Sequence, residues 1–338
     1  MSTTVDFVAV KPAVTESMRV QTLRGTACLL LVAFHVIGAT STQGLNLPVD
    51  SPYVTFTKLF MHLRMPLFAF LSGFVYAYRP MTDAREFLSK KLSRLLVPLV
   101  VVATIFFITQ LSIGGTNFKM TFADMWTIYL FPYCHFWFLQ AIIVIFAMTA
   151  AIEHFKLMRT PRAFMLVFAG ILAAHFLLPT PDFLSISRAF FLAPFFFAGI
   201  GVNRFRGQMQ HMGVRWAVMA VFLLSFSAYA AVCFIDPALL PEQKTVWATL
   251  IGLSGCLTLM YLMPSVRWLG WVGSFSFTIY LYHVFFTAGT RIALYRLGDF
   301  NVHDHVIMGL VLGIAGPVLF ELAVRRYRVG RRVLLGQS

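Results

Sequence analysis

Long apolar stretches recur along almost the whole sequence, from Leu23 to Ala323. Each is close to the length of about 20 residues that a helix needs to cross the hydrocarbon core of a membrane. Hydrophobic residues make up 59% of the 338 residues and charged residues 12%, whereas soluble domains contain about 45–50% and about 25%. A soluble core cannot bury this excess, so the sequence predicts an all-α polytopic membrane protein.

Ten segments are candidate transmembrane helices, and together they form one membrane domain over residues 20–323. Residues 1–19 form a mixed, polar N-terminal segment, and residues 324–338 form a short basic tail. The predicted helices cover residues 20–40, 58–79, 95–113, 134–153, 163–179, 188–203, 215–235, 245–264, 268–290 and 305–323.

The formal net charge of +14 would suggest nucleic-acid binding in a soluble protein. Here most of the 27 basic residues stand in short connections between apolar runs, where the positive-inside rule places them in the cytoplasm. We therefore interpret the basic residues as a sign of how the chain is oriented in the membrane, with both termini cytoplasmic. Membrane lipids are the expected surroundings, and no nucleic-acid partner is expected. The outer connections are too short to contain an enzyme domain.

The four cysteines have no metal-ligand spacing, and each lies in or beside an apolar run. We therefore expect buried free thiols and no metal site. They are Cys28, Cys134, Cys233 and Cys256.

Arg24 and His35 mark the two ends of one stripe on the first helix. Eleven residues turn a helix back to the same face after about 16 Å of rise, and Cys28 and Leu31 complete the stripe. Taken alone, Arg24 fits a snorkelling anchor at a helix end. His35 lies past mid-membrane in an apolar run without a local partner, which favours a functional role.

Further polar residues fall toward the outer ends of other helices. His62 and Arg64 open the second helix, and His135 opens the fourth. Tyr280 and His283 lie in the ninth helix. Each alone is compatible with packing or with an aromatic belt at the interface, but together with His35 they predict an outward-facing polar cavity.

Five motifs stand out along the chain. They are residues 20–35 (VQTLRGTACLLLVAFH), 65–74 (MPLFAFLSGF), 91–98 (KLSRLLVP), 135–139 (HFWFL) and 274–283 (SFSFTIYLYH). The acyltransferase-3 family of membrane-bound O-acyltransferases carries similar motifs in the same order, so the chain resembles that family. In that family, an Arg and a His with ten residues between them mark the first helix, as Arg24 and His35 do. Many relatives have an acidic residue just before Leu-Arg-Gly, whereas Gln21 and Thr22 stand here, so no role of that acid is carried over.

The resemblance implies that an acyl group, acetyl by similarity to members that act on exopolysaccharides, passes from cytoplasmic acetyl-CoA to a carbohydrate or lipid-linked glycan outside. It also implies a multi-pass protein of the bacterial inner membrane, with acyl-CoA as a substrate and no bound cofactor. The expected catalytic residues are His35 and Arg24. His35 is the expected base, because burial in a low-dielectric channel disfavours its charged form. Arg24, Lys91 and Arg94 are expected to bind the donor. The acceptor side is expected to involve Arg64, His135, Tyr280 and His283.

Other functions remain open from the sequence. The 65–74 motif also occurs in glucan succinyltransferase branches of the same family, so the acyl group is open, as is a covalent acyl-histidine step. A transporter or flippase for a glycan or lipid-linked intermediate predicts repeats and mid-membrane carboxylates, and the sequence shows neither clearly. In a membrane scaffold without activity, the histidines would be packing residues.

Overall fold

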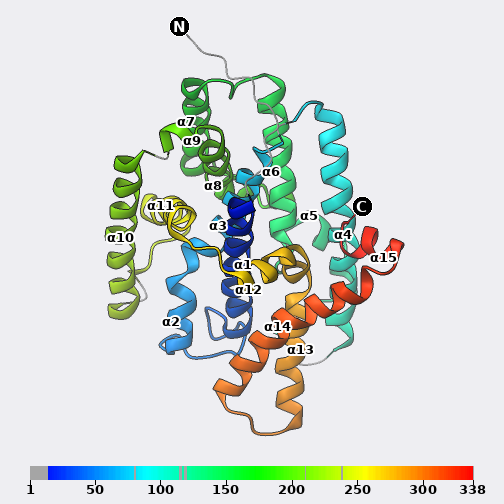
Figure 1. Cartoon of the computed structure of the whole chain (residues 1–338). Coiled ribbons are helices and arrows are strands. Elements are labelled where there is room, and N and C mark those ends of the chain that lie inside the picture. Colours follow the sequence, from blue (N-terminus) through cyan, green and yellow to red (C-terminus); the bar gives the residue numbers. More distant parts are fainter. Residues whose placement is uncertain are drawn as a thin grey trace.

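The computed structural model describes residues 14–79, 81–113, 116–117, 120–209, 211–236 and 239–337. Every regular element within these ranges is a helix (Figure 1). Residues 1–13 of the predicted N-terminal segment lie outside the described part. Its remaining residues, from Val14 on, already belong to the first helix.

The helices follow one another with short connections. The α-helices and the two 3₁₀-helices are α1 (Val14–Ile37), α2 (Pro52–Leu59), α3 (Met61–Tyr76), α4 (Ala84–Ser112), η1 (Phe122–Asp124), α5 (Thr127–Leu130), α6 (Trp137–His154), α7 (Pro161–Leu177), η2 (Phe183–Ser185), α8 (Ile186–Arg204), α9 (Arg206–Met209), α10 (Met212–Ile235), α11 (Val246–Leu262), α12 (Arg267–Ser274), α13 (Ser276–Leu297), α14 (Val302–Val324) and α15 (Arg328–Leu334).

All ten predicted membrane segments have helical counterparts. In the described residues, seven helical segments are long and apolar enough to cross a membrane, and the number is eight if the bent pair α12 and α13 is counted as one span. The segment Pro52–Tyr76, made of α2 and α3, counts as one of the seven. Helices α7 and α11 are apolar but have 17 residues each, which gives about 26 Å against a hydrocarbon core of about 30 Å. The chain is thus an all-α, multi-pass membrane protein.

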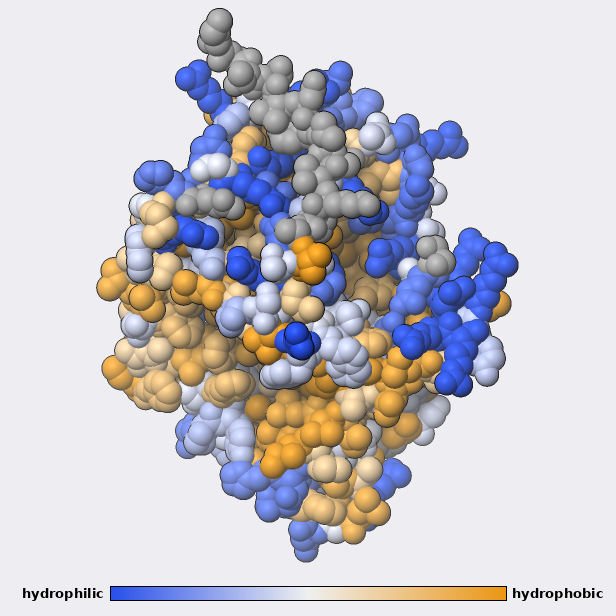
Figure 2. All heavy atoms as spheres, viewed as in Figure 1, coloured by the Kyte–Doolittle hydropathy of each residue, from blue (hydrophilic) through white to orange (hydrophobic). Residues whose placement is uncertain are grey.

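The surface agrees with this assignment. Figure 2 shows an apolar band across the middle and lower part of one face, with hydrophilic groups at the top, at the right edge and at the bottom. Helix α10 lies at the edge of the bundle (Figure 1), and its Leu224 and Phe234 are exposed. In water such residues would be unfavourable, whereas lipid chains solvate them.

The alternating helix directions give the bundle two ends, which we name for the predicted topology. The connection between α13 and α14 lies at the bottom of Figure 1, at the outer end. The inner end contains the described residues of the segments 77–83, 155–160 and 205–211, and the outer end contains the described residues of the segments 38–51, 113–121, 178–185, 236–245 and 298–301.

The expected continuous helix over residues 268–290 is wrong. Helices α12 and α13 meet at Phe275 with a bend of 79°. Both pieces are apolar and the break contains no proline, so hydrophobic periodicity carries no signal for it. The bend lets α12 pack across α1 while α13 continues toward the outer end.

The crossing of α1 and α12 depends on two glycines. A Cβ atom at Gly25 would lie 2.1 Å from the Leu269 carbonyl oxygen, and one at Gly273 would lie 1.8 Å from the Gln21 oxygen. These backbones touch directly, as small residues allow between membrane helices. Helix α1 also packs against α3, α13 and α14 and lies at the centre of the bundle (Figure 1). It is therefore the element around which the site is built.

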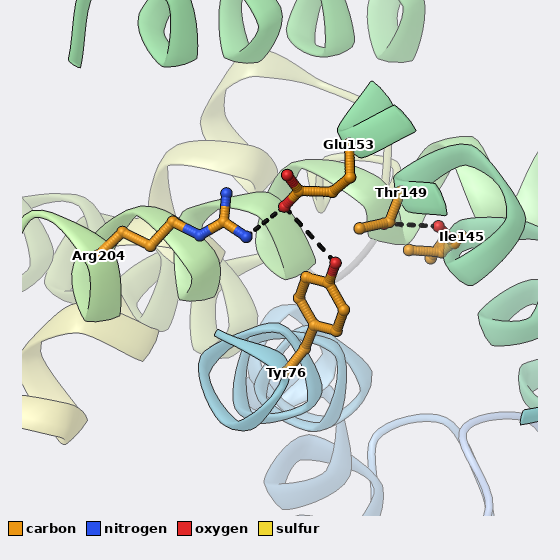
Figure 3. A network of polar contacts seen from close by, with 5 residues as sticks. All are labelled: Tyr76, Ile145, Thr149, Glu153 and Arg204. Atoms are coloured by element: carbon orange, nitrogen blue, oxygen red, sulfur yellow. Dashed lines mark hydrogen bonds and ion pairs between the residues drawn. The ribbon is translucent and has the colours of Figure 1, made fainter. Parts of the chain in front are cut away.

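A buried ion pair joins three helices at the inner end (Figure 3). Arg204 of α8 donates to Glu153 of α6, and the Tyr76 hydroxyl of α3 lies 3.5 Å from the same carboxylate oxygen. The Arg204 side chain is only 1% exposed. One turn earlier in α6, the Thr149 hydroxyl donates to the Ile145 carbonyl at 2.7 Å.

The basic tail folds back onto the bundle through α15, which packs on α4. The Tyr282 hydroxyl donates to the Leu334 carbonyl at 3.0 Å, and Gln337 donates to Glu321 at 2.9 Å. Leu335 is buried. The tail is therefore docked rather than a free basic segment.

The cysteines are free thiols, and three of them are buried as expected. The expectation is wrong for Cys134, which is exposed because it lines the cavity described below.

Candidate active site

Three histidines from distant parts of the chain meet in the bundle. His35 comes from α1, His135 precedes α6, and His283 lies in α13. The ring centroids of His35 and His283 are 4.7 Å apart, those of His135 and His283 are 5.0 Å apart, and those of His35 and His135 are 6.1 Å apart. The three residues that the sequence singled out on separate helices thus form one cluster.

Backbone carbonyls orient two of these rings. His283 Nδ1 lies 2.9 Å from the Ile279 oxygen and 2.8 Å from the Tyr280 oxygen, and His135 Nε2 lies 3.1 Å from the Leu281 oxygen. Carbonyl oxygens only accept, so these nitrogens donate. The opposite atoms, His283 Nε2 and His135 Nδ1, are buried without a hydrogen-bond partner in the described residues.

The three histidines differ in exposure and in access to a cavity. His35 is half-buried, whereas His135 and His283 are 3% and 0% exposed. His35 and His135 line a cavity of about 1190 Å³, and His283 is not among the lining residues. His283 therefore lies behind His35, away from the cavity.

The cavity extends from the histidine cluster to the outer end of the bundle. Its wall includes Thr42 to Leu45 after α1, Asn117 after α4, Gln243 before α11 and Leu297 at the end of α13. These positions belong to the connections for which the positive-inside rule predicts an outer location. The structure thus contains a cavity that extends toward the predicted outer end, with polar side chains set in a mostly apolar wall.

Arg64 and Tyr280, two of the residues predicted for the acceptor side, line this cavity. Arg64 lies with its guanidinium carbon 3.8 Å from the centre of the Phe34 ring. The Tyr280 hydroxyl donates to the His135 carbonyl. Tyr280 thus holds the segment that carries His135. His62 does not line the cavity; its ring packs 5.0 Å from that of Tyr229.

The residues expected to bind the donor lie toward the other end of α1. Arg24, Lys91 and Arg94 are close enough for their charges to interact. Arg24 and Lys91 are half-buried and Arg94 is exposed. None of the three lines the cavity. In the stripe between Arg24 and His35, Cys28 and Leu31 are buried, so the two groups of residues are separated by packed side chains.

Sequence reasoning did not assign four further basic residues of the cavity wall: Arg188, Arg291, Arg296 and His305. Arg291 directly follows the helix predicted over residues 268–290, and only the continuation of α13 to Leu297 places it inside a helix. The other three stand near segment ends, where the sequence cannot separate an anchor from a lining residue.

Comparison with known proteins gives one match. The model of a family described as an acyltransferase domain, the acyltransferase-3 type, covers residues 19–322 of this chain. That range runs from α1 to α14 and includes all the histidines of the cluster and all of the predicted donor residues. A search of curated proteins finds no match.

Proposed function

Because the chain belongs to the acyltransferase-3 family and is a multi-pass membrane acyltransferase, we propose that it transfers an acetyl group from cytoplasmic acetyl-CoA to a hydroxyl of a carbohydrate on the outer side. The carbohydrate is a cell-surface, periplasmic or lipid-linked glycan, and the membrane is the bacterial inner membrane. The observation that carries the proposal is the position of His35, on the wall of a cavity that extends to the outer end.

His35 acts as the general base in this proposal. A ring nitrogen of His35 takes the proton of the acceptor hydroxyl as its oxygen attacks the thioester carbon. The new C–O bond forms, the C–S bond breaks, and the coenzyme A thiolate takes the proton from the imidazolium. A thioester is already activated, so direct attack needs no covalent enzyme intermediate, in contrast to an acyl-histidine route.

The other two histidines serve different roles. His135 lines the cavity, which supports contact with the acceptor. The ring of His283 is fully buried, and its centroid lies 4.7 Å from that of His35. This position supports a role in orienting His35 rather than in contacting the acceptor. The carbonyl-bound Nδ1 of His283 leaves its Nε2 as an acceptor. His283 is thus proposed as a positioning residue.

The donor approaches from the inner end. Arg24, Lys91 and Arg94 provide three cationic groups for the phosphates of acyl-CoA. The acyl group then has to pass the buried Cys28 and Leu31 to reach His35. A separation of α1 from α13 along this stripe would provide the passage, because Cys28 Sγ faces the Ser276 carbonyl at the start of α13.

The test uses inverted membrane vesicles, in which the cytoplasmic side faces the medium. Acetyl-CoA labelled in the acetyl group is added outside, and labelled glycan is sought in the lumen; succinyl-CoA is compared in parallel. Transfer is expected with acetyl-CoA, and only when it is supplied on the cytoplasmic side. Labelled glycan from right-side-out vesicles instead would contradict the topology, and transfer from succinyl-CoA alone would contradict the acetyl donor.

A further inference from the structure

The cavity wall is strongly cationic. Four arginines line it: Arg64, Arg188, Arg291 and Arg296. Among the described residues that form the wall, none is an aspartate or a glutamate. A cavity with one sign of charge and low-dielectric walls concentrates ligands of the opposite charge.

Arg64 is the cation nearest to the reacting centre. It lies close enough to His35 for their charges to interact, and it is 8% exposed. Its Nη1 atom is buried without a hydrogen-bond partner among the described residues. Phe34 covers one face of the guanidinium, which leaves the edge donors for a planar acceptor group. A buried donor without an acceptor is unfavourable, so an acceptor on a bound ligand would satisfy it, and an anionic acceptor makes the strongest hydrogen bond to a guanidinium.

Arg188 extends the cationic surface toward the outer connections. Its guanidinium carbon lies 5.5 Å from the centre of the Trp137 ring, and both residues line the cavity. Next to it, partial burial and the charge of Arg188 lower the pKa of Lys244, and Asp182 opposes this shift. Arg188 therefore has a second cation, Lys244, close by on this side of the bundle.

Aromatic side chains also line the cavity. Phe106, Phe131, Tyr133 and Trp137 line the cavity with the arginines. Flat aromatic faces suit the apolar C–H faces of sugar rings, and planar guanidinium groups suit carboxylates and phosphates. The combination matches a carbohydrate that carries negative charge.

We propose that the acceptor is an acidic glycan whose carboxylate or phosphate group binds Arg64 while the hydroxyl to be acylated faces His35. The proposal rests on the proposed function, in which this cavity holds the acceptor. The anion is either a carboxylate of a sugar in the glycan or the phosphate of a lipid-linked glycan, and the chemistry at Arg64 is the same.

The first experiment compares matched ligands on the purified full chain in a nonionic detergent. Calorimetric titration measures the affinity for a β-1,4-linked tetramer of glucuronate and for cellotetraose, its uncharged counterpart. We expect the acidic tetramer to bind about tenfold or more tightly, with a preference that decreases as salt is added. Equal affinities, or no binding of either ligand at millimolar concentration, would overturn the proposal.

Two further arms identify the source of the anion. The second arm compares the affinity for glucose 1-phosphate with that for glucose. If this affinity ratio exceeds the ratio between the glucuronate tetramer and cellotetraose, the anion is a phosphate of a lipid-linked glycan. If it is smaller, the anion is a sugar carboxylate. The third arm adds adenosine 3′,5′-bisphosphate, which carries the charges of the coenzyme A head. Displacement of the glucuronate tetramer by this compound would assign the cations to the donor and overturn the proposal.

Variants locate the effect. Arg64→Gln is expected to remove most of the preference for the acidic tetramer, and Arg64→Lys, which keeps the charge, to retain part of it. The control is Arg162→Gln at the start of α7, an exposed residue at the inner end, which should keep the full preference. If Arg64→Gln does not fold, the affinities of Arg64→Lys and of the wild-type protein for the acidic and neutral ligands still test the proposal. An unchanged preference in a folded Arg64→Gln protein would contradict the assignment.

An acyl-transfer assay on the same samples separates the two proposals. Absence of acyl transfer from acetyl-CoA to any acceptor would count against the proposed function. Transfer to neutral and acidic glycans at the same rate would count against the acidic acceptor alone.

Discussion

The arginine side chains at the two ends of the bundle have different neighbours. At the inner end, Arg204 pairs with Glu153 and Arg206 pairs with Glu16 at 2.9 Å. In the outer cavity, Arg64 and Arg188 lie over aromatic rings, and no described carboxylate lines the wall. Buried charges that pair within the protein hold helices together, whereas charges left over in a cavity are available to a ligand. The contrast separates residues expected to act on stability from residues expected to act on catalysis.

The largest effect is expected from His35→Ala, which removes the base without removing a pairing partner. Acyl transfer should fall by about 10²–10⁴-fold, with little change in the melting temperature because the side chain borders a cavity. The rate is measured with labelled acetyl-CoA and the stability by thermal unfolding in detergent. Full activity at normal expression would show that His35 is not the base.

At the inner end, Glu153→Ala should have the opposite profile. The variant removes the carboxylate that receives Arg204 and Tyr76, and loss of one partner of a buried pair costs roughly 3 kcal/mol. We expect a clearly lower melting temperature and a smaller loss of activity in the folded fraction than for His35→Ala.

The matched control is Glu86→Ala, which breaks the exposed pair with Lys90, whose side chains are 61% and 74% exposed. That pair should contribute less than about 1 kcal/mol. Equal shifts in melting temperature for the two glutamate variants would show that the inner pair is not a structural link.

A third variant tests the close contact between the backbones of α1 and α12, the crossing that positions α13. Gly273→Ala places a methyl group 1.8 Å from the Gln21 oxygen, and the resulting shift of α12 should cost about 2 kcal/mol. Gly170→Ala in α7 is the control, since nothing lies within 4 Å of its added methyl group. This control should be neutral or slightly stabilising. A Gly273→Ala protein as stable as wild type would contradict the close approach.

The smallest effect is expected from Arg24→Lys at the inner end of α1. The charge is kept but the two-pronged guanidinium is lost, so the Michaelis constant for acetyl-CoA should rise by about tenfold if Arg24 binds a phosphate or carbonyl. The Michaelis constant for the acceptor should not change. An unchanged value for acetyl-CoA would assign Arg24 to anchoring at the membrane interface instead.

Much of the site was visible in the sequence because a polar residue is costly in a membrane segment. His35, His135 and His283 stood out against apolar runs, and the structure brings them together. The different positions of the three rings relative to the cavity could not be predicted from the sequence. Which ring faces the cavity and which lies behind it depends on how α1 and α13 turn toward each other, and helical periodicity does not determine that.

The sequence by itself determined the membrane class, the order of the apolar helices and the predicted orientation, because hydrophobic length and the distribution of basic residues act locally along the chain. Only the tertiary structure decided where α12 and α13 break, that the tail docks on α4, and that the arginines of the cavity face a wall without described carboxylates. These features depend on contacts between residues far apart in sequence. The packing of Gly25 against α12 and of Phe34 against Arg64 exists only once the helices have assembled.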